Sequence, residues 1–62
     1  MDEKELKKEY ARLKRVAVEL AGEVHDIVED TLWVKYSELP VLSAKIVKAI
    51  TEAEAFKARH GL

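Results

Sequence analysis

Apolar and small residues in the first half of the chain recur at alternating steps of four and three residues. The series is Leu6, Tyr10, Leu13, Ala17, Leu20, Val24 and Ile27. Such steps keep the side chains on one face of a helix, as in the seam of a coiled coil. Val16, Ala21 and Val28 widen this face, which suits a helical bundle better than a two-stranded coil. The pattern predicts a helix over about residues 4–30.

The second half of the chain repeats the pattern. Its series is Leu39, Leu42, Ile46, Ala49, Ala53 and Phe56. Ser37 suits the N-cap position, and Pro40 then falls in the first helical turn, where its missing N–H costs little. Gly61 stands where a helix would end. A second helix is therefore predicted over about residues 38–60.

The connector between the predicted helices, about residues 31–36, is short enough to make them fold back antiparallel. The expected layers pair Ile27 with Leu39, Val24 with Leu42, Leu20 with Ile46, Ala17 with Ala49, Leu13 with Ala53 and Tyr10 with Phe56. The Ala17–Ala49 layer is small, so it allows close approach of helices or admits larger side chains from another chain.

The length of the chain indicates that it needs a partner. A domain of 62 residues buries little apolar surface. The sequence has no cysteine, so disulfides and thiolate metal sites are excluded, and oligomerisation is the remaining source of stability. We predict an all-α fold: a single domain over residues 1–62, an antiparallel helical hairpin that dimerises into a four-helix bundle or forms a larger homo-oligomer.

Charge is distributed unevenly along the chain. Residues 1–15 carry six Lys/Arg and four Asp/Glu, residues 16–38 carry one Lys and six acids, and residues 39–62 carry four Lys/Arg and two Glu. Folding back therefore places the acidic segment at the turn and both basic segments at the open end. An antiparallel pair of hairpins would bring opposite charges together, which biases orientation rather than supplying the association energy.

Nothing in the sequence indicates a membrane protein. The N-terminal segment is charged, and no apolar run approaches the roughly 20 residues that span a bilayer. We expect a cytoplasmic location and no membrane contact.

His25 is the candidate metal ligand. Glu29 lies one helical turn further on, so the two side chains could hold a metal together. A stable site needs three or four protein ligands, which would require a second copy of His25 or water. The favoured interpretation is a solvent-facing histidine.

An acidic run and a tryptophan are the candidate partner-binding residues. Asp26, Glu29 and Asp30 fall in the last turns of the first helix, where the helix dipole disfavours negative charge. They form either a solvated face or a docking surface for a basic partner. Trp33, the only tryptophan, lies in the connector. It either contacts a partner or caps the end of the bundle, and we expect the cap.

Gly22 lies in the middle of the first predicted helix, where glycine costs about 1 kcal/mol relative to alanine. It shares an outer stripe with Ala11, Val18 and His25. Because a glycine in such a place usually has a packing reason, we expect a second contact surface there.

The composition argues against catalysis. The chain has no cysteine, no glycine-rich phosphate loop and two separated histidines, so we predict no enzyme activity and no cofactor. RNA binding is the rival function, since basic residues crowd one end: Lys4, Lys7, Lys8, Arg12, Lys14 and Arg15. Interleaved acids and a net charge of −1 make nucleic acid a less favoured ligand.

Two segments carry a family resemblance. Residues 25–30, His-Asp-Ile-Val-Glu-Asp, are followed by Tyr-Ser-Glu-Leu-Pro at residues 36–40. Together they resemble the small Rop-like proteins associated with nitrogen-fixation gene clusters, over about residues 13–58. In that family an acidic segment closes the first helix and a Leu-Pro or Ile-Pro step opens the second; Ile27 stands where Leu is usual.

The resemblance implies a homodimeric four-helix bundle connected with nitrogenase maturation or function, with no reaction of its own. His25 is the position it marks as a candidate metal contact. We therefore expect a non-enzymatic accessory protein of the nitrogen-fixation system that binds a nitrogenase-related protein. The alternative is an RNA-binding four-helix-bundle regulator like Rop itself.

Overall fold

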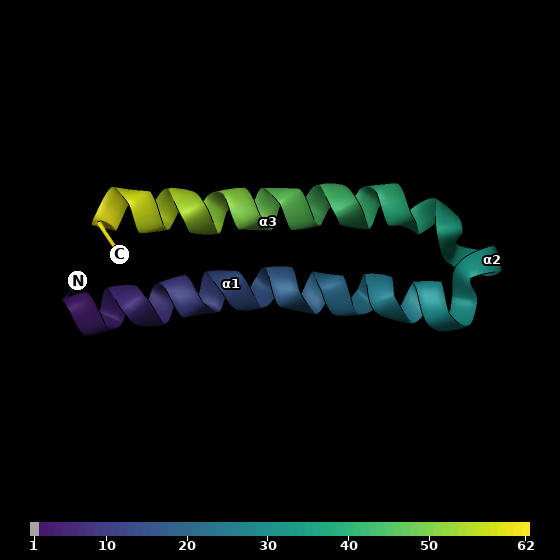
Figure 1. The fold of residues 1–62 in the computed structure, drawn as a ribbon, viewed down its shortest axis with the longest axis horizontal. Coiled ribbons are helices and arrows are strands. Elements are labelled where there is room, and N and C mark those ends of the chain that lie inside the picture. Colours follow the sequence, from purple (N-terminus) through teal and green to yellow (C-terminus); the bar gives the residue numbers. More distant parts are fainter. Residues whose placement is uncertain (1) are drawn as a thin grey trace.

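The computed structural model describes residues 2–62, and every element within them is helical (Figure 1). The long helix α1 spans Glu3–Asp26, and the long helix α3 spans Leu39–His60. Between them come a π-helical turn η1 at Ile27–Thr31, the short helix α2 at Leu32–Lys35 and a 3-10 turn η2 at Tyr36–Glu38. Helices α1 and α3 lie side by side and antiparallel in a rod of 46 × 16 × 11 Å. The all-α prediction is confirmed.

The ends of the long helices follow known capping chemistry. The Asp2 carboxylate accepts a hydrogen bond from the Glu5 backbone N–H at 2.8 Å, which satisfies one of the free donors of the first turn. At the other end Gly61 adopts φ 65°, the left-handed conformation expected of a helix C-cap. Pro40 lies in the first turn of α3, as predicted. The predicted N-cap is wrong, because Ser37 lies within η2 and α3 follows Glu38.

The connector differs from the predicted loop. It is built of short helical pieces, and α1 ends at Asp26 rather than near residue 30. No glycine or proline occurs between Gly22 and Pro40, so no residue there forces the helical hydrogen bonding to stop. The chain instead changes direction at Thr31, with φ −129° and ψ 26°, and at Lys35, with φ −114° and ψ 11°.

The predicted seam forms the interior of the helix pair. Ile27, Leu42, Ala49 and Ala53 are buried. The other seam residues are half-buried: Leu6, Tyr10, Leu13, Ala17, Leu20, Val24, Leu39, Ile46 and Phe56. Within its own bounds α1 buries no residue completely. One helix pair therefore leaves much of the seam open to solvent.

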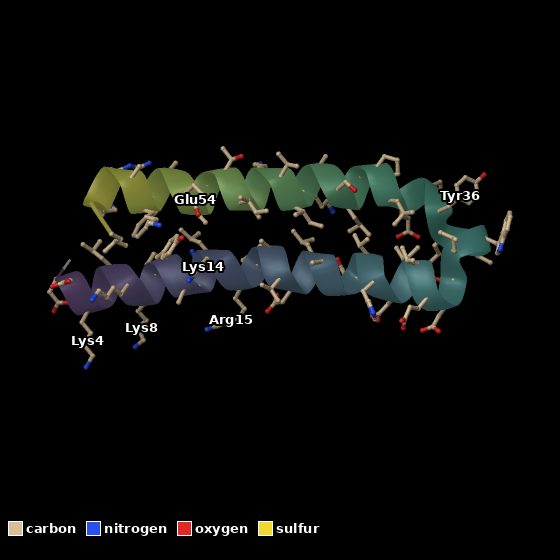
Figure 2. All side chains as sticks on the ribbon, in the orientation of Figure 1. Lys4, Lys8, Lys14, Arg15, Tyr36 and Glu54 are labelled. Atoms are coloured by element: carbon tan, nitrogen blue, oxygen red, sulfur yellow. The ribbon has the colours of Figure 1, made fainter. Side chains whose placement is uncertain are left out.

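A side-chain contact between the helices reports their register. The Tyr10 hydroxyl donates a hydrogen bond to Glu54 Oε1 at 3.1 Å, two residues from Phe56, the predicted partner of Tyr10. Figure 2 shows Glu54 on the side of α3 that faces α1. The Lys14 ammonium lies 4.6 Å from the centre of the same tyrosine ring, a distance typical of a cation–π contact.

No helix within residues 2–62 combines the length and the apolar character needed to cross a membrane.

Candidate docking surface at the helical turn

The turn between the long helices exposes a group of large apolar side chains, here called the turn patch: Leu32, Trp33, Val34 and Tyr36. Trp33 is 90% exposed, Val34 81% and Tyr36 62%. Trp33 therefore does not cover the seam of its own chain, and the expectation that it caps the end of a bundle of two or more chains stays a prediction. Figure 2 shows Tyr36 at the turn end of the rod, on the outer side and pointing away from α1.

A shallow apolar hollow of 290 Å³ lies within the turn patch, lined by Leu32, Trp33 and Tyr36. Its existence follows from the helical connector. Because α2 begins at Leu32 and η2 begins at Tyr36, the backbone turns tightly and splays these side chains outward instead of folding them over the seam. Sequence reasoning selected Trp33 but not Leu32 or Tyr36, although all belong to the one aromatic-rich segment.

A second, polar hollow of 430 Å³ adjoins the turn, here called the acidic hollow. It is lined by Glu23, Asp26, Ile27, Asp30, Thr31 and Lys35. Asp26 and Asp30 are two of the three predicted acidic binding residues, and Glu23, which begins the same acidic run of the sequence, was not among them. Since Asp30 and Thr31 directly precede the turn patch, the two surfaces are contiguous along the chain. The acids lie at the C-terminal end of α1, where the helix dipole adds negative potential.

Glu29, the third predicted acidic residue, is directed to another neighbour. Its Oε1 lies 3.4 Å from His25 Nε2, and Asp26 Oδ1 lies 3.8 Å from His25 Nδ1. The imidazole is 66% exposed, and the carboxylates of Asp26 and Glu29 are 82% and 62% exposed. Within residues 2–62 no group of three or more histidine, cysteine, aspartate or glutamate side chains could hold a metal ion. One chain thus supplies the predicted His25–Glu29 pair without a further ligand of these types.

The basic end of α1 divides into paired and free cations. Lys7 lies 3.3 Å from Glu3, and the Arg12 guanidinium donates to Glu9, with Nε at 3.1 Å from the carboxylate oxygen. The hydrogen bond from Arg12 lowers the pKa of Glu9 below its ordinary value.

Lys4, Lys8 and Arg15 form no ion pair within residues 2–62. Figure 2 shows all three pointing away from α3, on the outer face of α1. The three side chains form an outer row of cations on α1.

The outer stripe around Gly22 is open. Nothing lies within 4 Å of the position that a Cβ at Gly22 would occupy, and Val18 on the same stripe is 68% exposed. Within one chain the stripe therefore packs against nothing, and the expected second contact surface stays a prediction.

Comparison with known proteins gives a family match over nearly the whole chain. A family model described as Rop-like matches residues 1–60. No curated protein matches the chain, and no solved structure does.

Proposed function

The chain belongs to the Rop-like family, and from this premise we propose that it is a non-enzymatic accessory interaction protein of the nitrogen-fixation system. In this proposal two copies form a four-helix bundle in the cytoplasm. The turn patch and the neighbouring acids then dock on a protein of nitrogenase maturation or function. No cofactor takes part.

The half-buried seam supports the association of two copies. Only four apolar residues are buried among residues 2–62, and Leu13, Leu20 and Ile46 remain half-buried. A second helix pair laid over this open seam would remove further apolar surface from water, at roughly 25 cal/mol per Å². The acidic turn of one copy would lie beside the basic open end of the other if the two hairpins run antiparallel.

The exposure of Trp33 is the observation that carries the docking proposal. A tryptophan that leaves 90% of its surface in water contributes little to the stability of its own chain. Tryptophan and tyrosine are also the residues most often found as the energetic centres of protein interfaces. An exposed tryptophan beside Leu32 and Tyr36 is therefore better explained by contact with another molecule than by packing in the hairpin.

Affinity capture from cells that grow on dinitrogen tests the proposal. The wild-type chain is compared with the double variant Asp26→Lys/Glu29→Lys, and captured proteins are identified by mass spectrometry. We expect the wild type to retain a nitrogenase-related protein and the double variant to lose it, because reversed charge creates repulsion at a complementary interface.

The matched control is Glu19→Lys/Glu52→Lys, which makes the same change in net charge at two exposed acids on α1 and α3. It should retain the captured protein. Thermal melts of each variant show that folding is intact. Undiminished capture by Asp26→Lys/Glu29→Lys would contradict docking through the acidic turn and leave these residues as a solvated face.

RNA binding is the second candidate function, and the outer row of Lys4, Lys8 and Arg15 favours it. Binding through several phosphates weakens steeply as salt rises, because counterions are released on association. Docking through apolar side chains keeps most of its affinity as the salt concentration rises. Titration of labelled RNA at increasing salt, with Lys4→Ala/Lys8→Ala/Arg15→Ala as the comparison, therefore separates the two functions. Salt-sensitive binding that this triple variant loses would favour RNA.

A further inference from the structure

We propose that the turn patch and the acidic hollow together bind a short segment of the partner protein that combines one large aliphatic side chain with adjacent lysine or arginine residues. The inference rests on the proposed function, because it names the chemistry of the partner segment for the same surface. The aliphatic side chain enters the apolar hollow, and the cations face the carboxylates of Glu23, Asp26 and Asp30.

The volume of the apolar hollow limits the size of the aliphatic side chain, the anchor, that the partner segment can insert. The hollow has a volume of 290 Å³, at the lower limit of small-molecule pockets, about 300–1,000 Å³. It is also open to solvent beside Trp33 and Val34, which are 90% and 81% exposed. A small, open hollow of this kind suits one side chain of a docked segment. Because the lining consists of Leu32, Trp33 and Tyr36, the side chain that fits is apolar.

The acidic hollow sets the charge of the flanking residues. Three carboxylates line it against one cation, Lys35. The C-terminal end of α1 adds a partial negative charge to the same region. A partner segment with lysine or arginine beside its anchor therefore meets complementary charge at this surface. The same charge disfavours the surface of an anionic membrane, which would otherwise suit an exposed tryptophan.

The fluorescence of Trp33 gives a direct readout of this surface, because Trp33 is the only tryptophan of the chain. The probe is a short synthetic peptide of leucine and lysine with serine spacers. Two comparison peptides replace its leucines by serine or its lysines by glutamate. We expect the leucine–lysine peptide alone to shift the Trp33 emission to shorter wavelength in a saturable manner.

Variants of the acidic hollow test the charge contribution while keeping the tryptophan. Glu23→Gln/Asp30→Asn should weaken binding of the leucine–lysine peptide about tenfold, since two partly exposed ion pairs are lost. The matched control Glu19→Gln/Glu52→Gln removes two exposed acids elsewhere and should bind with unchanged affinity. Equal weakening by both variants would show general charge attraction and overturn the inference.

Three further outcomes would overturn it. The first is an equal shift with the leucine-to-serine peptide, and the second is a larger shift with anionic lipid vesicles than with the peptide. The third is a wild-type emission that moves to longer wavelength when dilution separates the subunits, which would identify a second copy as the cover of Trp33. If the leucine–lysine peptide gives no shift while capture of a nitrogenase-related protein succeeds, this inference fails and the proposed function stands.

Discussion

Tyr10 links the two long helices through its hydroxyl, which donates to Glu54. Burial raises the pKa of this phenol above its ordinary value of 10.0, and the hydrogen bond to the Glu54 carboxylate adds to the shift. A raised pKa in the folded state means that the stabilisation is complete below the unfolded pKa. It is lost as pH rises through the folded pKa, when the donor becomes an anion beside Glu54.

The pH dependence of Tyr10→Phe therefore differs from that of the wild type. At neutral pH the variant should be less stable, because a hydrogen bond between the helices is missing. The difference in unfolding free energy should shrink or reverse as pH rises above about 10. Denaturant unfolding at a series of pH values measures it. A difference that stays constant up to high pH would show that the Tyr10–Glu54 bond does not form.

Trp33 offers a second test at the residue scale. Trp33→Ala should change the unfolding free energy by less than about 0.5 kcal/mol, the usual range for exposed positions, and should abolish capture of the partner protein. Thermal melts paired with affinity capture measure both. A large loss of melting temperature together with binding would mark Trp33 as a core residue after all.

The sequence predicts burial better than it predicts exposure at the turn. Every predicted seam residue is buried or half-buried, because a repeat of three and four residues fixes which face of a helix is apolar. Trp33 lies where that repeat stops. The direction of the Trp33 side chain depends on the backbone angles φ and ψ of Thr31 and Lys35. The spacing of apolar residues does not predict those angles.

At the scale of the elements, the two glycines have opposite effects on the stability of the helices that contain or end at them. Gly22 has ordinary helical geometry and open space around it, so Gly22→Ala should raise the unfolding free energy by about 0.5–1 kcal/mol. Gly61 has φ 65°, so Gly61→Ala should lower it by about 1 kcal/mol. Denaturant unfolding of both variants measures the two changes in unfolding free energy. A loss of stability in Gly22→Ala would indicate that another chain packs on the outer stripe.

The long helices were predictable as elements, whereas the connector was not. The second helix starts at Leu39, one residue after its predicted start, and ends at His60, because Pro40 and Gly61 mark its limits. The connector has no such residue, so the sequence suggested a loop where the chain forms η1, α2 and η2. This difference matters for the site, because the helical connector splays Leu32 and Tyr36 outward around the apolar hollow.

At the scale of the whole molecule, the open seam predicts that folding and association are coupled. Leu20→Asp places a charge in the half-buried seam, which costs on the order of several kcal/mol if a second copy covers that position. This variant should unfold or dissociate, as circular dichroism and sedimentation would show. Arg15→Asp is the control: its exposed side chain points away from α3 on the outer face of α1, and the variant should stay folded. Equal behaviour of the two variants would contradict a covered seam.

Sedimentation equilibrium of the wild-type chain at micromolar concentration tests the pairing of two helical hairpins most directly. A seam with only four buried residues among residues 2–62 of one chain supports a folded state when a second copy covers the rest. We predict a folded species with twice the mass of one chain, or a larger multiple, whose helical signal decreases as dilution separates the subunits. A stable, well-folded monomer at this concentration would contradict the dimeric bundle.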